Sequence, residues 1–268
     1  MFAFVLAGLF VGAAVGLTGV GGGSLMTPIL ILLFGFTPSS AVGTDLLYAA
    51  GTKAFGTLLH GRQRTVDWPV VGLMAAGSLP AAIVTIIWLH LVGLEPWVQE
   101  LMVVTLAVTM IVTAVLTFAR DRLVRWLQGR MLFVSGKNRS NLLAWRPVIT
   151  VLGGVVLGVL VSLSSVGAGV LGTTMLLILY PNTRVVRIVG TDITHAVPLT
   201  LIAGLGHLTL GTTNLGVLGL LLLGSLPGIY IGTRAGRRLP DRALRPIIAG
   251  VLVVVAASMI YKTLHLGG

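Results

Sequence analysis

The sequence contains no cysteine, and only 9% of its 268 residues are charged. Without cysteine the chain has neither a disulfide framework nor a thiolate metal site. A soluble domain of this length needs far more charge to cover its surface. What is present agrees, because 56% of the residues are hydrophobic and 36 are glycines, which let helices pack closely in lipid. The composition therefore predicts a protein embedded in the lipid bilayer.

Acidic residues are also scarce: seven stand against 18 lysines and arginines, and the formal net charge is +11. A basic balance can indicate nucleic-acid binding, so the positions of the charges decide between the two interpretations. Sixteen of the 18 basic residues lie in connections between apolar segments, at 60–68, 120–146, 181–187 and 234–245. Because cytoplasmic loops of membrane proteins are rich in lysine and arginine, we interpret these charges as a topology signal and expect no nucleic-acid partner.

Apolar segments fill the chain between these loops, and one crossing of a bilayer core about 30 Å thick needs about 20 helical residues. The ten segments that we expect to be helical are 3–18, 23–35, 40–59, 69–92, 98–119, 147–163, 169–180, 187–208, 214–234 and 244–263. The first two and the sixth and seventh are short, and a glycine-rich break joins each pair. This pattern predicts broken or re-entrant helices, whose irregular backbone must be buried in protein or line a polar cavity.

The loop charges assign an orientation to every segment. If the basic loops are cytoplasmic, the loop 93–98, which carries Glu95 and no base, faces the outside. Both termini are then predicted outside, and the two halves of the chain have opposite orientations. The first segment has no basic flank and no small-residue cleavage site, so we expect it to be retained rather than removed as a signal peptide.

An internal repeat relates the two halves. At an offset of 146, Gly8, Gly12, Gly21 and Thr27 recur as Gly154, Gly158, Gly167 and Thr173. At an offset of 147, Gly43-Thr44-Asp45, His60 and Gly77-Ser78-Leu79-Pro80 recur as Gly190-Thr191-Asp192, His207 and Gly224-Ser225-Leu226-Pro227. We therefore predict a transmembrane repeat at 1–119, a basic cytoplasmic linker at 120–146 and an inverted repeat at 147–268.

The predicted fold is an all-α integral membrane protein made of two inverted-topology repeats of about five helical segments, each with a glycine-rich broken or re-entrant helix near its start. Secondary transporters use inverted repeats for alternating access, with the substrate near the membrane midplane where the repeats meet. The sequence therefore favours a secondary transporter.

The stretches GLTGVGGGSLMTP (16–28) and SLSSVGAGVLGTT (162–174), with the duplicated Gly-Thr-Asp and Gly-Ser-Leu-Pro, resemble the sulfite exporter TauE/SafE family, also called the toluene sulfonate uptake permease family. The resemblance covers nearly the whole chain. It implies ion-gradient-driven transport of sulfite, sulfoacetate, sulfonates or related small organic anions across the bacterial inner membrane. Many relatives carry serine or asparagine where this chain has Asp45 and Asp192, and two acids at these positions favour proton coupling over simple anion binding.

The two glycine-rich breaks are the first candidate for the substrate site. A helix that restarts after a break presents unpaired N–H groups with positive partial charge, and nearby hydroxyls add further donors. The residues that we expect to line the substrate site are Thr18, Gly21, Gly22, Gly23, Ser24 and Thr27 in the first half, with Ser164, Ser165, Gly167, Gly169 and Thr173 in the second. The alternative interpretation is that these glycines only allow close helix packing.

Lys53 is the second candidate, because it lies about 13 residues, or about 20 Å, into its segment. A base at this depth is costly, so it either binds the substrate anion or pairs with Asp45 or Asp192. Each aspartate lies near the first turn of its predicted helix, where it either caps the helix or relays a proton or cation. His195 follows Asp192 by three residues and shares its helical face, so it is a further coupling candidate.

Other classes of function fit less well. An anion channel remains the alternative, because similar folds can form pores. No nucleophile–base pair suggests an enzyme, and no phosphate-binding loop suggests nucleotide-driven pumping. We expect no metal and no other cofactor. The expected partners are a small anionic substrate and protons or sodium as the coupling ion, while a homodimer and the direction of transport stay open.

Overall fold

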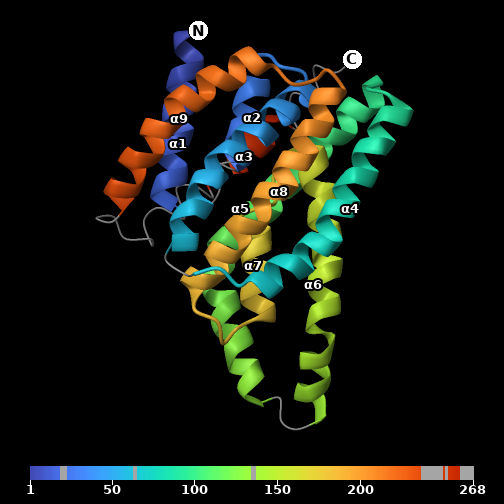
Figure 1. Cartoon of the computed structure of the whole chain (residues 1–268), viewed down its shortest axis with the longest axis vertical. Coiled ribbons are helices and arrows are strands. Elements are labelled where there is room, and N and C mark those ends of the chain that lie inside the picture. The colour runs from blue at the N-terminus through green and yellow to red at the C-terminus, as the bar shows by residue number, and fades with distance from the viewer. Residues whose placement is uncertain (19–22, 63–64, 134–136, 237–249, 251–252, 260–268) are drawn as a thin grey trace.

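The chain folds into helices only, in a computed structural model that describes residues 1–18, 23–62, 65–133, 137–236, 250 and 253–259. The helices are α1 (Phe2–Thr18), α2 (Gly23–Leu32), α3 (Pro38–Arg62), α4 (Trp68–Val92), α5 (Pro96–Phe133), α6 (Lys137–Ser164), α7 (Val170–Leu179), α8 (Val185–Thr209) and α9 (Leu215–Gly236). Residues 253–259 are also helical, within the range expected for the tenth segment. Figure 1 shows these helices as one elongated bundle.

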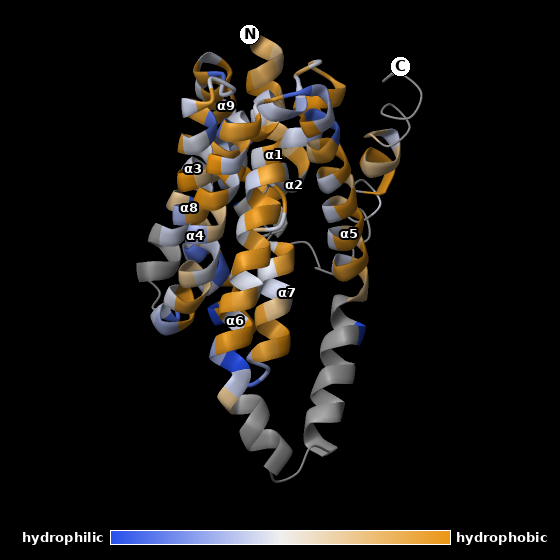
Figure 2. Ribbon diagram, turned by 90° about the vertical axis from the view of Figure 1, so that its right-hand side faces the viewer, coloured by the Kyte–Doolittle hydropathy of each residue, from blue (hydrophilic) through white to orange (hydrophobic). Residues whose placement is uncertain are grey.

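Among the described residues, five helices are long and apolar enough to cross a membrane: 68–92, 96–119, 144–164, 185–209 and 215–232. Their outward faces carry large apolar side chains such as Val84, Val115 and Leu223, each more than half exposed, as expected for side chains in contact with lipid. Figure 2 shows hydrophobic residues along the bundle and hydrophilic ones near the lower end of α6. The predicted all-α integral membrane fold is confirmed.

Glycines create two helix–helix seams that bring the halves together. α1 packs along α9, and α4 packs along α6. A Cβ atom added at Gly8 would overlap the Leu221 carbonyl, and one added at Gly154 would overlap the Met74 carbonyl. Gly154 and Met74 correspond to Gly8 and Leu221 by the repeat offsets. The same contact therefore occurs twice with the halves exchanged, and only glycine allows the backbones to approach so closely.

The centre of the bundle is formed by α3 and α8, which pack against each other, while the short helices α2 and α7 lie against them. Each short helix has ten residues. At 1.5 Å per residue each spans about 15 Å, half the thickness of a bilayer core. Neither short helix is therefore long enough to cross the bilayer core by itself, as expected for broken or re-entrant helices.

The two ends of the bundle differ in charge. The α5–α6 hairpin and the α7–α8 connection, with Arg184 and Arg187 after it, lie at the lower end in Figure 1, which we call the basic end. The α4–α5 connection with Glu95 lies at the opposite end, together with the N-terminus. α1 begins at this opposite end, whereas α6 begins at the basic end. Both α5 and α6 extend into the range 120–146, the predicted linker.

Candidate functional site

Two buried aspartates hold the short helices against the central ones. The Asp45 carboxylate of α3 accepts hydrogen bonds from the backbone N–H and the hydroxyl of Thr27 in α2. In the second half, Asp192 of α8 accepts a hydrogen bond of 2.9 Å from the Thr173 hydroxyl of α7. These four residues correspond by the repeat offsets and are all buried.

The expected position of both aspartates near a first helical turn is wrong. α3 begins at Pro38 and α8 at Val185, so neither helix has an acidic residue in its first turn. Each aspartate is the eighth residue of its helix, beyond the reach of the unpaired N–H groups at the helix start. Their hydrogen bonds go to the neighbouring short helices, so the aspartates do not cap their own.

The α6–α7 break is a buried stretch of irregular backbone, and residues 161–169 are all buried. Ser165, Gly167 and Gly169 have positive φ angles of 60°, 123° and 147°. A positive φ is uncommon for serine, and such backbone conformations gather at functional sites, where the surrounding structure holds them. Ser165 also faces the Asp45 carboxyl group of the other half.

Lys53 reaches this break from α3. Its side chain is only 4% exposed, and Nζ donates a hydrogen bond of 2.6 Å to the carbonyl oxygen of Ala168. Asp45 and Asp192 are close enough for their charges to act on the ammonium group. A protonated lysine has three N–H donors, so the bond to Ala168 leaves two for other partners. The structure thus brings the only predicted intramembrane base together with both predicted coupling acids.

His195 contacts α4, one of the two helices of the α4–α6 seam. Its Nε2 atom is 2.7 Å from the Ser78 hydroxyl, and the ring is fully buried. The corresponding position in the first half is Tyr48, which lies beside Ser225, the counterpart of Ser78. The predicted face shared by Asp192 and His195 is therefore present, with both residues buried in α8.

Of the remaining predicted residues, the structure describes some and not others. Ser164 lies in the α6–α7 break, where its hydroxyl bonds to the backbone of Leu160 and Val166. Thr18 ends α1, and Gly23 and Ser24 begin α2. Gly21 and Gly22 lie outside the described residues, so the structure assembles the second-half break only.

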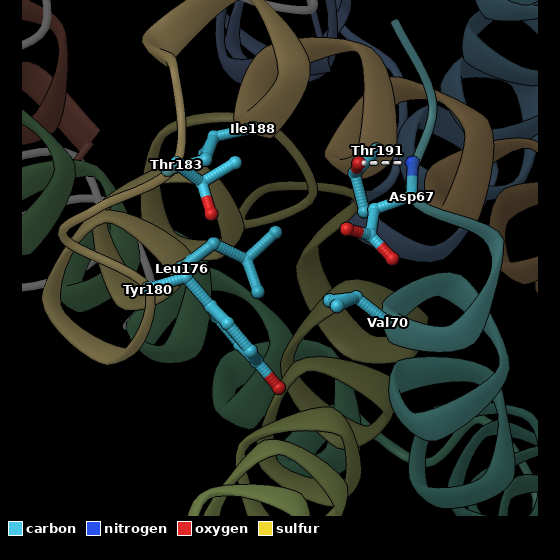
Figure 3. A pocket seen from close by; sticks show the side chains of 7 residues that line it. All are labelled: Asp67, Val70, Leu176, Tyr180, Thr183, Ile188 and Thr191. Carbon is cyan, nitrogen blue, oxygen red and sulfur yellow. Dashed lines mark hydrogen bonds between the residues drawn. The ribbon is translucent and has the colours of Figure 1, made fainter. Parts of the chain in front are cut away.

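A hollow at the basic end was not predicted from the sequence. Asp67, Val70, Leu176, Tyr180, Thr183, Ile188 and Thr191 line it. Figure 3 shows the Thr191 hydroxyl beside the Asp67 backbone N–H, which donates a 2.9 Å hydrogen bond to it. The Arg187 guanidinium forms an ion pair of 3.3 Å with Asp67. The one sign of this region in the sequence is that Asp67 is charged, whereas its counterpart in the repeat, Asn214, is neutral.

Known proteins resemble the chain over nearly its whole length. The sequence model of the family described as sulfite exporter TauE/SafE matches residues 4–259. The chain is 38% identical to the probable membrane transporter protein YjnA of Bacillus subtilis, over 96% of this chain and 98% of the relative. It is 25% identical to the probable membrane transporter protein MJ0441 of Methanocaldococcus jannaschii, over 96% and 94%. No solved structure matches the chain significantly. The chain is therefore a multi-pass membrane transporter that belongs to the sulfite exporter TauE/SafE family.

Proposed function

We propose that this protein is a secondary transporter of small anions of the sulfite, sulfoacetate or sulfonate class in the bacterial inner membrane. The observation that carries the proposal is Lys53, a buried ammonium group bonded to the backbone of a broken helix. Intramembrane bases are costly and mark substrate or ion pathways. A cation beside irregular backbone offers charge and hydrogen-bond donors to a small oxyanion.

The anion site in this proposal is the α6–α7 break. Ser165, Gly167 and Gly169 give the break an irregular backbone that a small ligand can approach closely, and α7 begins directly after them. The N–H groups of a helix start carry positive partial charge and favour an anion. Lys53 in α3 provides a side-chain donor beside the break, and the Thr173 hydroxyl in α7 provides a second when its bond to Asp192 opens. The first-half break is the corresponding candidate by the repeat.

Alternating access by two inverted repeats is the mechanism that we propose. Its support is the equivalence of the two glycine seams and of the two Thr–Asp pairs, with α1 and α6 beginning at opposite ends of the bundle. In such folds the repeats rock against each other around a site near the midplane. An anion channel, the alternative, requires no such rocking and no gradient coupling.

Coupling to a cation follows from the charges in the buried centre. Asp45 and Asp192 supply two acids against the single base Lys53. An anion that enters beside them adds negative charge to a region of low dielectric, which is unfavourable unless a cation enters too. We therefore propose that protons or sodium ions move with the substrate, with Asp45, Asp192 and His195 as the coupling residues.

Anion flux into proteoliposomes tests the proposal. A panel of sulfite, sulfoacetate, sulfonates and carboxylates is offered to the wild type, to Lys53→Met and to Thr200→Val. Thr200 occupies the position of Lys53 in the second half, and its hydroxyl bonds to Ala196 of its own helix, so Thr200→Val is the matched control. We expect Lys53→Met to lose roughly tenfold or more of the flux, which corresponds to about 1.4 kcal/mol or more.

Three results would contradict this account. If no anion of the panel moves, the substrate class is wrong. If Lys53→Met transports as well as Thr200→Val, the site assignment is wrong. Unitary currents without any response to an imposed ion gradient would establish the channel instead.

A further inference from the structure

The residues that line the hollow have counterparts in the repeat, and these lie at the opposite end of the bundle. The two ends share one hydrogen bond between a backbone N–H and a threonine hydroxyl. Asp67 N–H donates to the Thr191 hydroxyl, and Asn214 N–H donates to the Thr44 hydroxyl at 3.1 Å. The offset of 147 relates Asp67 to Asn214 and Thr44 to Thr191. The backbone is therefore arranged alike at the two ends, and we call this shared arrangement the frame. A difference between the two ends reflects their side chains.

Apolar side chains fill the frame at the opposite end. Leu30, Ala41 and Val217 take the positions of Leu176, Ile188 and Val70, and all three are buried in the core. Phe34 takes the position of Tyr180 and stacks on Phe4 with ring centroids 4.3 Å apart. Phe36 meets Phe4 edge-on. Three aromatic rings therefore pack together at this end of the protein.

Polar side chains occupy the same positions at the basic end. Tyr180 is within 3.0 Å of Thr150, which is the counterpart of Phe4, so a hydroxyl pair replaces the stacked rings. Arg146 lies 5.9 Å from the centroid of the Tyr180 ring. Arg187, the counterpart of Ser40, pairs with Asp67. Of these side chains, Asp67 and Tyr180 line the hollow (Figure 3).

The charges around the hollow favour an anion. Arg146, Arg184 and Arg187 stand against one acid, Asp67, and a concave site with an excess of one charge attracts ions of the opposite sign. The Arg187 side chain is 49% exposed and the Asp67 side chain 27%, so the guanidinium can exchange Asp67 for an oxyanion while both side chains stay in contact with solvent. The Thr183 side chain, which is in the lining, brings a hydroxyl to such a ligand. The Thr191 hydroxyl already donates to the Arg187 carbonyl oxygen at 2.7 Å.

The hollow also lies next to the buried centre. Thr191 lines it, and the following residue, Asp192, bonds to Thr173 in α7. We propose that the hollow is an entry subsite for the transported anion at the basic end, where Arg187 receives a sulfonate-type or sulfite-type oxyanion before it reaches the α6–α7 break. This inference rests on the proposed anion transport, and it adds a second binding position and a residue for it.

Protection of an introduced cysteine tests the subsite, since the chain has no cysteine of its own. Thr183→Cys places a thiol in the lining, and Thr37→Cys places one in the corresponding loop at the opposite end. The probe is sulfoacetate, because sulfite itself reacts with thiol reagents. We expect saturating sulfoacetate to slow maleimide labelling of Thr183→Cys in detergent by roughly fivefold or more, as a bound ligand excludes the reagent, and to leave Thr37→Cys unchanged.

Transport kinetics provide a second, independent measurement. Arg187→Gln removes the proposed contact, and Arg184→Gln removes the same charge from an exposed residue three positions earlier. Neither arginine is among the lining residues, but Arg187 is joined to the lining through its ion pair with Asp67. We expect Arg187→Gln to raise KM roughly tenfold, the range of a charge-assisted hydrogen bond, with kcat little changed, and Arg184→Gln to raise KM far less.

The outcomes separate the subsite from the function. Flux of an anion that neither protects Thr183→Cys nor distinguishes the two arginine variants overturns the subsite and leaves the transporter standing. Equal slowing of labelling at both cysteines also overturns it, because it indicates a general change in shape. Failure of every anion in the panel to move or to protect removes both proposals.

Discussion

The two halves of the chain share a frame and differ in what the frame carries. Both halves have the glycine seam, the Thr–Asp pair and the backbone contact at one end of the bundle. Only the first half has Lys53, whose counterpart is Thr200, and only the second has His195, whose counterpart is Tyr48. The packing contacts and the two buried aspartates therefore follow the repeat, whereas Lys53 and His195 do not.

The largest effect is expected from variants that disrupt the two glycine seams. Gly8→Ala and Gly154→Ala each place a methyl group on the backbone of the partner helix. We expect each to lower the free energy of unfolding by about 3 kcal/mol or more, the upper range for overpacking, because a backbone carbonyl cannot move aside as a flexible side chain can. The measurement is the thermal midpoint and the monodispersity of the purified protein in detergent.

Gly72→Ala and Gly219→Ala are the matched controls for the seams. They are also related by the repeat, and nothing lies within 4 Å of a Cβ atom at either position. Alanine is preferred to glycine within a helix by about 0.5–1 kcal/mol, so the controls should be neutral or slightly stabilising. Equal losses in all four variants would show that the seams are not special.

An intermediate effect is expected at the Thr–Asp pairs. Thr27→Val and Thr173→Val each remove one hydroxyl donor from a buried aspartate while keeping the side-chain shape. Hydrogen bonds to charged groups contribute about 1.5–3 kcal/mol, so each variant should melt several degrees lower, and by similar amounts. Thr109→Val, whose hydroxyl bonds only to Thr105 in its own helix, is the control and should lose less. A loss confined to one pair would break the equivalence of the halves.

The smallest effect concerns the contrast between the two ends. Tyr180→Phe gives the basic end the side chain of the opposite end, since Phe34 is its counterpart, and removes the hydroxyl contact with Thr150. The expected loss is about 1 kcal/mol, the net contribution of a neutral hydrogen bond. A thermal midpoint a few degrees below that of the wild type would agree, whereas a loss as large as that of Gly154→Ala would assign Tyr180 to the packing frame.

The membrane fold could be predicted from the sequence, because apolar segments and loop charges are local properties. The equivalence of Asp45 and Asp192 could be predicted too, since the same Gly-Thr-Asp recurs after both breaks, but their bonds to the short helices could not. The lysine partner could not be predicted either. A buried ammonium must find an acceptor, but only the three-dimensional arrangement shows that the acceptor is the carbonyl oxygen of Ala168, 115 residues away.

The hollow at the basic end escaped prediction for a related reason. Its lining comes from α4, α7 and α8 and the loop residues beside them, and no periodicity in one segment marks a space between several. The first-turn placement of Asp192 failed because the helix begins at Val185, before the apolar pattern that suggested its start. Helix boundaries are the least reliable part of a sequence-based assignment.

Side-specific labelling of two corresponding loops tests the central claim, that the two halves have opposite orientations around a buried polar centre. Thr37 in the α2–α3 loop and Asn182 in the α7–α8 loop are both exposed, and each can carry the only cysteine of the chain. Our account predicts that a membrane-impermeant maleimide added to intact cells labels Thr37→Cys but reaches Asn182→Cys only after the membrane is opened. Labelling of both positions from the same side would contradict the inverted repeat and the transport mechanism that depends on it.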